Sequence, residues 1–72
     1  MNDGYERLAM AIVEMAVLDY KEALEHFSKD PWDNAARAQI KKLRRFFNSS
    51  YFTLLCDLDP EMLMRRIEEA YV

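Results

Sequence analysis

The sequence predicts an all-α protein, a small bundle of three to four helices with a long first helix, arranged as one helical domain over residues 1–72. Two observations predict this fold class. The chain holds one glycine and two prolines, which are too few turn residues for a sheet of short strands. Apolar residues recur at spacings of three and four, as they do along the buried face of a helix. The breaks between these runs are short, which favours antiparallel neighbours.

The first helix is expected from about Tyr5 to Ser28, after a cap from Asn2 or Asp3. Short polar side chains at this position accept hydrogen bonds from the free N–H groups of the first turn. Two apolar stripes follow the helix, and together they are wider than the ~100° stripe of an ordinary surface helix. This width predicts burial on two sides, with a second subunit covering one of them. The residues expected at that interface are Leu8, Ile12, Met15 and Tyr20.

The second helix is predicted from the junction "KDPWDNAARA" (residues 29–38). Asp30 is expected as the N-cap, Pro31 as the first helical residue, and Asp33 as an acid that faces the positive end of the helix dipole. The helix then runs to about Phe47. Its inner stripe is expected to consist of Ala36, Ile40, Leu43 and Phe47.

Two further helices are predicted after the polar break "NSS". Ser49 or Ser50 caps a short helix, "YFTLLCDL", whose two aromatic residues are assigned mainly to the core. Asp59 and Pro60 then open a last helix over about residues 60–71. This helix is expected to bury Leu63, Met64, Ile67 and Tyr71 and to expose Arg65, Arg66, Glu68 and Glu69.

The size and composition of the chain point to self-association. A domain of 72 residues buries only ~60% of the surface that its unfolded chain exposes, so its stability is marginal. Cys56 and His26 are the only cysteine and histidine, which excludes an intrachain disulfide and leaves too few ligands for a structural zinc ion. Association with further copies remains as the source of added stability. A homo-oligomer is therefore expected.

A cytoplasmic location is expected from three features. The lone cysteine fits a reducing compartment. The N-terminus "MNDGYER" lacks the basic segment and apolar core of a secretory signal. The longest apolar run, residues 8–18, is too short to cross a bilayer, so no membrane partner is expected.

The sequence carries no motif for catalysis or for a cofactor. A single glycine excludes a glycine-rich phosphate loop, and no third group is placed to orient His26 and Cys56 as a catalytic pair. His26 is instead expected at the surface beside Glu22, one turn earlier, and Cys56 as a small buried hydrophobe. The chain also lacks the Glu-x-x-His motif of carboxylate metal sites in bundles. We therefore expect a protein without enzymatic activity, metal or cofactor.

Five bases and no acid lie between residues 34 and 56, although the net charge of the chain is −3. On a helix, four of these bases share one face and the fifth lies beside it. The face is either solvated, paired with acidic helices, or a site for an anion such as a phosphate. The bases are Arg37, Lys41, Lys42, Arg44 and Arg45. Sequence-specific DNA binding is not expected, because the following segment "YFTLLCDL" offers no Arg, Lys, Gln or Asn to base edges.

The stretch "RRFFNSSYFTLLCDLDPEMLMRRI" (residues 44–67) resembles a group of small, largely uncharacterised helical proteins encoded in phages and prophages of Gram-positive bacteria. The stretch "AIVEMAVLDYKEAL" (residues 11–24) resembles their first helix, so the likeness covers most of the chain. Pro60 stands where a glycine is frequent in the group, and Tyr51 where a tryptophan is frequent. The group has no agreed activity. The matching positions are Arg45, Phe46, Phe47, Ser49, Tyr51, Phe52, Leu55, Leu58, Asp59, Glu61 and Leu63.

Two functions are expected. The first is a non-enzymatic interaction protein, a homo-oligomer that binds a host or phage protein in the host cytoplasm and is a candidate inhibitor of host defence; the wide apolar surface of the first helix favours it. The resemblance implies this context, because small phage proteins often act by binding. The alternative is a protein that binds a nucleotide or another anionic ligand as a sponge, or an accessory protein that binds nucleic acid, through the five bases of the second helix.

Overall fold

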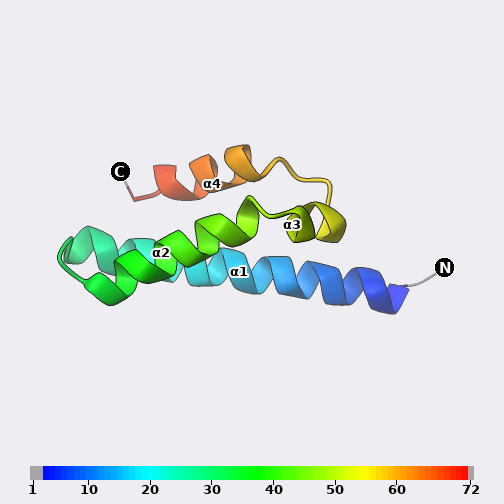
Figure 1. Cartoon of the computed structure of the whole chain (residues 1–72), viewed down its shortest axis with the longest axis horizontal. Helices are drawn as coiled ribbons and strands as arrows, with labels where there is room; N and C mark the ends of the chain where they lie inside the picture. The colour runs from blue at the N-terminus through cyan, green and yellow to red at the C-terminus, as the bar shows by residue number, and fades with distance from the viewer. Residues whose placement is uncertain (1–2, 72) are drawn as a thin grey trace.

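A computed structural model describes residues 3–71 and confirms the predicted all-α fold with a long first helix. Within these residues there are four helices and no strand. The helices are α1 (Asp3–Lys29), α2 (Asn34–Phe47), α3 (Ser50–Leu55) and α4 (Pro60–Glu69). α2 folds back beside α1, α3 continues over α1, and α4 returns above the longer helices (Figure 1). The molecule is elongated, with extents of 46 × 20 × 19 Å.

α1 is slightly longer than predicted, because it includes Asp3 and continues to Lys29. Asp3 is therefore part of the helix and not its cap, and Asn2, the other predicted cap, lies outside the described residues. The last turn contains an ion pair between Lys29 Nζ and Glu25 Oε1 at 3.3 Å. A cation at this position also suits the negative end of the helix dipole, which explains why the helix extends this far.

α2 begins at Asn34, so the prediction that Pro31 opens the helix is wrong. Asp33 is the N-cap, and its carboxylate accepts the backbone N–H three residues further on at 3.1 Å. The predicted cap, Asp30, instead accepts the backbone N–H of Trp32 at 3.0 Å and stabilises a turn before the helix. Both aspartates cap backbone N–H groups, and the second one starts the helix because the first is used by the turn.

The N-caps of α3 and α4 are those that the sequence predicts. Ser49 is the N-cap of α3, where its Oγ accepts the backbone N–H three residues on at 3.3 Å. Asp59 is the N-cap of α4 and accepts the N–H two residues on at 3.0 Å, with Pro60 as the first helical residue. α4 ends at Glu69, before its predicted end, and residues 70 and 71 form a turn.

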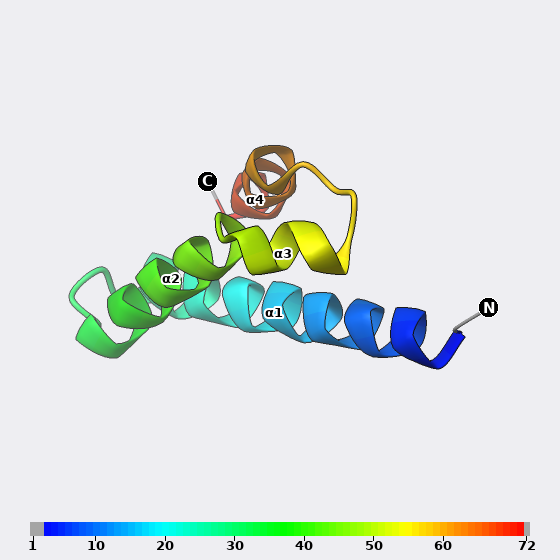
Figure 2. The same cartoon turned by 45° about the vertical axis from the view of Figure 1, so that its right-hand side comes forward.

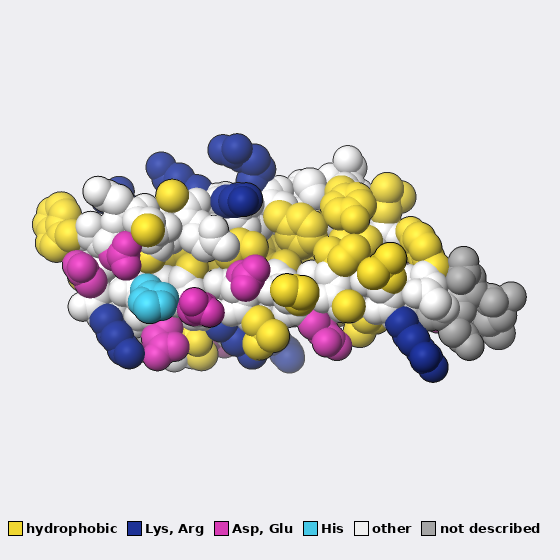
Figure 3. Space-filling view, turned by 90° about the horizontal axis from the view of Figure 1, so that it is seen from below, with side chains coloured by type: hydrophobic (Ala, Val, Ile, Leu, Met, Phe, Trp, Pro, Cys, Tyr) yellow, Lys and Arg dark blue, Asp and Glu magenta, His cyan; other side chains and the backbone are white. Residues whose placement is uncertain are grey.

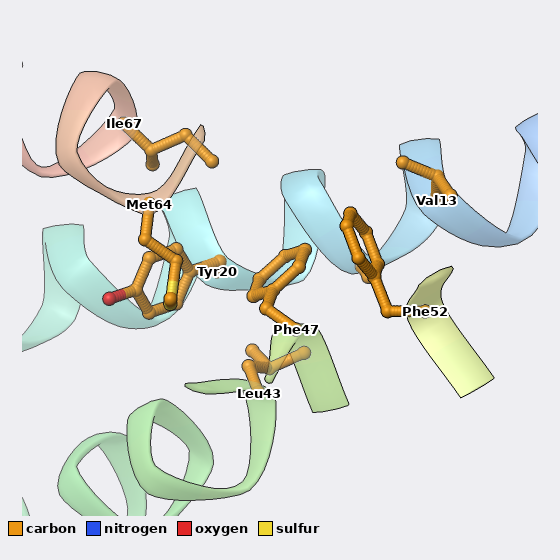
Figure 4. Packing of buried hydrophobic residues seen from close by; sticks show 8 residues of the cluster. Val13, Tyr20, Leu43, Phe47, Phe52, Met64 and Ile67 are labelled. Carbon is orange, nitrogen blue, oxygen red and sulfur yellow. The ribbon is translucent and has the colours of Figure 1, made fainter. Parts of the chain in front are cut away.

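The core is built around three fully buried rings, those of Tyr20 in α1, Phe47 in α2 and Phe52 in α3. Phe47 lies between the other two, with ring centroids 5.6 Å from Tyr20 and 5.5 Å from Phe52 (Figure 4). Both pairs are edge-to-face, a geometry that the ring quadrupoles favour. α4 completes the core with Met64 and Ile67, whose burial was predicted. A single ring, that of Phe47, thus links α1 with α2 and α3.

α3 buries only one of its two aromatic rings. The burial of Phe52 is confirmed, but the assignment of Tyr51 to the core is wrong, because this side chain is 50% exposed. Consecutive residues point about 100° apart on a helix, so a short α3 cannot turn both rings toward α1. Cys56, expected to be buried, is half-buried after the end of α3.

The apolar surface of α1 is covered by the rest of the chain on one side only. The buried side consists of Ala9, Val13, Ala16, Tyr20 and Ala23, and α2, α3 and α4 all pack against α1. The N-terminal end of α1 extends past α3 in both ribbon views (Figures 1 and 2). The predicted stripe of Leu8, Ile12 and Met15 is not covered by the rest of the chain: Leu8 and Met15 are exposed and Ile12 is half-buried.

Candidate functional site

Five apolar side chains at the surface, three of them exposed (Leu8, Met15 and Tyr51) and two half-buried (Ile12 and Phe46), are here called the apolar patch. Leu8 and Met15 are 61% and 64% exposed. Figure 3 shows this face of the molecule, with apolar side chains gathered over the N-terminal half of α1 and the neighbouring helices. Acidic side chains gather mostly toward the other end of the same face. The face is therefore divided into a mainly apolar half and a charged half, which holds most of its acidic side chains together with Lys and Arg side chains and is here called the acidic half.

The apolar patch contains a shallow groove between α1 and α2. Ile12 and Met15 line one wall and Phe46 the other, around a volume of about 310 Å³, and Lys42 stands at its edge. The ring of Tyr51 packs edge-to-face on Phe46, with centroids 6.2 Å apart. The patch thus combines a helical stripe at spacings of four and three with two aromatic rings, which are enriched in protein interfaces.

Tyr20 does not belong to this surface, and its predicted place at an interface is wrong. Its side chain has no exposed area, because α2 and α4 cover it within the chain. Leu8, Ile12 and Met15 lie together on the patch. Sequence reasoning missed Phe46 and Tyr51 as patch residues, since both were grouped with apolar neighbours that are expected in the core. Only the crossing of α2 over α1 decides which side of each ring is covered.

The acidic half of this face surrounds a second shallow pocket of about 300 Å³, lined by Asp19, Glu22, His26 and Asp33 among others. His26 is exposed and lies 3.9 Å from Glu22, as predicted. Nowhere in residues 3–71 do three or more His, Cys, Asp or Glu side chains stand together in a way that could hold a metal ion.

A polar cluster joins α1, α2 and α4 on the side of the core that lies away from the apolar patch. The hydroxyl of Tyr20 donates a hydrogen bond to Glu68 Oε2. Arg44 Nη1 donates to the same carboxylate oxygen at 2.8 Å and to the Tyr20 hydroxyl at 3.3 Å. The hydroxyl points away from Phe47 in the core (Figure 4). Glu68 was expected to be exposed, but it is half-buried because α4 holds it against Tyr20.

The pKa of Tyr20 is raised to about 12, chiefly because burial disfavours the phenolate, and also because the hydroxyl donates its proton to Glu68. In the unfolded chain the hydroxyl titrates near its ordinary pKa of about 10. Between these values the folded protein retains a proton that the unfolded chain loses, so stability is expected to fall as pH rises from about 10 to about 12. This contribution is fully present below pH 10.

Tyr20→Phe removes the hydroxyl and tests this titration. We expect a loss of about 1 kcal/mol of unfolding free energy at neutral pH, because one hydrogen bond to a half-buried carboxylate is lost. The decline above pH 10 should be shallower than in the wild type. Urea denaturation at a series of pH values measures both effects. Parallel curves for the two proteins above pH 10 would contradict the role given to Tyr20.

The five bases of the predicted basic face are divided between different surroundings. Arg37, Lys41 and Arg44 line one groove, on the side of α2 that faces α4. Lys42 lines the groove of the apolar patch on the other side of α2. Arg45 is exposed. The five bases therefore do not form one uniform face. Of the three predicted alternatives, pairing with an acidic residue of another helix applies to Arg44, which binds Glu68 in α4 of its own chain.

His26 and Cys56 are not close to each other. Cys56 lines a surface pocket with Ala9 near the beginning of α1. His26 is near the end of the same helix and lines the acidic pocket, about 25 Å further along at 1.5 Å per residue. The structure therefore does not bring these two residues together as a nucleophile and a base.

No helix among residues 3–71 is both long enough and apolar enough to cross a membrane. No protein-family model matches the chain, and neither the curated proteins nor the solved structures contain a match to it. The candidate functional surfaces are therefore interpreted from their side chains alone. They are the apolar patch on one side of the molecule and, on the other, the groove lined by Arg37, Lys41 and Arg44, here called the basic groove.

Proposed function

We propose that this protein is a non-enzymatic helical binding protein that forms a homodimer through the apolar patch. The exposure of the patch supports this proposal. Monomeric soluble proteins seldom keep large contiguous apolar patches in water unless these are interaction sites, and here Leu8 and Met15 are both largely exposed beside the half-buried Ile12 and two aromatic rings. Covering such surface stabilises an assembly by about 25 cal/mol per Å² of apolar area.

A second copy of the chain is the occupant that the molecule favours. The core contains few large side chains, and among the residues whose burial the structure describes, Tyr20, Phe47 and Phe52 are the large ones that are fully buried. A domain of this size usually needs a disulfide, a metal ion or a second subunit for stability. With Cys56 as the only cysteine and no metal-binding group in the described chain, the second subunit is the remaining means.

The charges around the patch favour an antiparallel, two-fold arrangement of the two α1 helices. Asp19 follows Met15 one turn further along the same stripe. In a parallel pair the two Asp19 carboxylates would face each other, which is unfavourable. In an antiparallel pair centred near Ile12, the two Asp19 residues are instead separated by about 20 Å along the helix axis, at 1.5 Å per residue. A two-fold axis also lets the same patch serve both subunits.

Two methionines of α1 provide a matched test of the dimer. Met15→Glu places a charge inside the apolar patch and is expected to give a monomer. Met10 is also exposed but lies about 140° around the helix axis, so Met10→Glu should leave the dimer intact. Sedimentation velocity over a dilution series measures the association, and circular dichroism verifies that both variants remain helical. A monomeric wild type, or equal association of all three proteins, would contradict the proposal.

We further propose that the dimer binds a host or phage protein and that it inhibits a host defence. The resemblance of residues 44–67 to phage and prophage proteins supports this role. A second apolar surface, where Leu54 is 73% exposed beside Met10 and Tyr5, is available to such a partner. A photo-cross-linking residue at Leu54 should then capture one defined protein in bacterial cells. The absence of any such adduct would contradict this role without affecting the dimer.

A further inference from the structure

A groove between α1, α2 and α4 combines cations with an apolar wall. Its volume is about 250 Å³. Leu24 and Phe27 of α1 and Ile40 of α2 form the apolar part, while Arg37, Lys41 and Arg44 of α2 bring positive charge. Glu68 of α4 and the Tyr20 hydroxyl complete the lining. This groove lies on the far side of the core from the apolar patch, so its occupation is independent of the proposed dimer.

The positive charge of the groove is only partly compensated within the chain. Arg44 is paired with Glu68 at 2.8 Å. The side chains of Arg37 and Lys41 make no hydrogen bond or ion pair to any other residue in the described range 3–71, although the backbone N–H of Arg37 donates to Asp33 within the first turn of α2. They stand four residues apart on α2, where like charges repel each other. An anion held between Arg37 and Lys41 would relieve this repulsion and gain charge-assisted hydrogen bonds.

The apolar wall defines the rest of the ligand. Leu24 and Ile40 are half-buried and Phe27 is 36% exposed, so the wall remains accessible from the groove. A simple inorganic anion would leave this wall in contact with water. Ligand pockets for drug-sized molecules have volumes of about 300–1,000 Å³, and this groove is smaller. Its shape and charge therefore suit a small molecule with one charged end and one apolar end.

We propose that this groove is a binding site for a small amphiphilic anion. The carboxylate or phosphate of the ligand binds Arg37 and Lys41, and its aliphatic or aromatic part packs on Leu24, Phe27 and Ile40. The Arg44–Glu68 ion pair closes the groove on the side of α4 and fixes the position of the charged end. The site holds one small molecule; it does not follow a nucleic-acid strand, because Lys42 and Arg45 lie outside it.

Calorimetric titration of the wild-type protein with three probes tests the ligand class. Sodium octanoate supplies a carboxylate with an aliphatic chain, phenyl phosphate supplies a phosphate with a ring, and 1-octanol is the neutral analogue of the first probe. At least one of the two anions should bind with a Kd on the order of 1 mM or tighter. 1-Octanol should bind much more weakly. The two anion titrations distinguish an aliphatic carboxylate from an aromatic phosphate as the better ligand.

Two double variants on α2 locate the site. Arg37→Gln/Lys41→Gln removes the two unpaired cations of the groove and should weaken anion binding by at least about tenfold, since charge-assisted hydrogen bonds are lost. Lys42→Gln/Arg45→Gln removes the same charge from the same helix outside the groove and should leave binding unchanged. All four side chains are exposed, so both variants should fold as the wild type does.

Several results would overturn the proposal. They are the absence of binding by both anions, equal binding of 1-octanol and octanoate, or unchanged affinity in Arg37→Gln/Lys41→Gln. Inorganic phosphate that binds as tightly as phenyl phosphate would also overturn it, because the apolar wall would then contribute nothing. An oligonucleotide whose binding is weakened equally by both double variants would indicate a nucleic-acid surface instead. The comparison of octanol with octanoate uses only the wild type and does not depend on the folding of a variant.

Discussion

Replacing Phe47 with alanine is expected to lower the unfolding free energy by about 3–5 kcal/mol, as is usual for a buried phenylalanine. The ring has no exposed area and contacts three other rings, with centroids 5.6 Å from Tyr20 and 5.5 Å from both Phe46 and Phe52. These contacts link α1, α2 and α3. Because a domain of this size rarely has more than about 5 kcal/mol of stability, Phe47→Ala should be largely unfolded at 25 °C.

Urea denaturation followed by far-UV circular dichroism measures this effect. Trp32→Ala is the control, because Trp32 is a larger aromatic residue that is 83% exposed in the turn before α2. A surface substitution of this kind changes stability by no more than about 0.5 kcal/mol. A Phe47→Ala protein that unfolds at the wild-type urea concentration would show that Phe47 is not the centre of the core.

The secondary structure was predictable because its signals are local. Apolar spacing identified α1 and α2, and short polar residues next to a proline or a serine pair identified the caps Ser49 and Asp59. The start of α2 was wrong because Asp30 and Asp33 are both good caps. The sequence contains no local signal that assigns one of them to the turn and the other to the helix, and tertiary packing of α2 decides between them.

The polar cluster was not predictable from local patterns. Glu68 is 48 residues from Tyr20 in the sequence, and Arg44 is 24 residues from both. One signal was available: Glu68 lies four residues after the buried Met64 and hence on the inner side of α4. Its charge nevertheless argued for exposure. Only the packing of α4 over α1 and α2 brings a carboxylate, a guanidinium and a phenol together.

The apolar patch and the basic groove depend on which side of a helix is covered. α1 carries two apolar stripes that are equivalent in the sequence, and α2 covers the stripe that contains Val13 and Tyr20 while Leu8 and Met15 stay exposed. The same crossing separates Lys42 from Arg37 on α2. Hydrophobic spacing predicts that a stripe is buried somewhere, but not whether its partner is the same chain or another molecule.

The second large effect on stability is expected at Arg44, and its neighbour in α2, Arg45, provides the control. Arg44→Glu is expected to lower the unfolding free energy by about 2 kcal/mol, because it removes a charge-assisted donor and leaves Glu68 facing a like charge. Arg44 is itself half exposed, with 51% of its side chain in water, so screening limits the Coulomb part. The larger part comes from the hydrogen bonds that Arg44 donates to Glu68 and to the Tyr20 hydroxyl, which the variant cannot make. The new carboxylate also repels Glu68, which accepts the hydrogen bond of that hydroxyl.

Arg45→Glu makes the same change of charge one residue further along, where the side chain is exposed and has no partner among residues 3–71. We expect it to alter stability by no more than about 0.5 kcal/mol. The swap Arg44→Glu/Glu68→Arg restores opposite charges and should recover part of the loss, which a double-mutant cycle measures as a coupling between the two positions. Equal effects of Arg44→Glu and Arg45→Glu would mean that the basic face responds only to its total charge. A difference confined to position 44, with recovery in the swap, would establish that this arginine holds α4 against the body of the protein and is not part of a uniform solvated face.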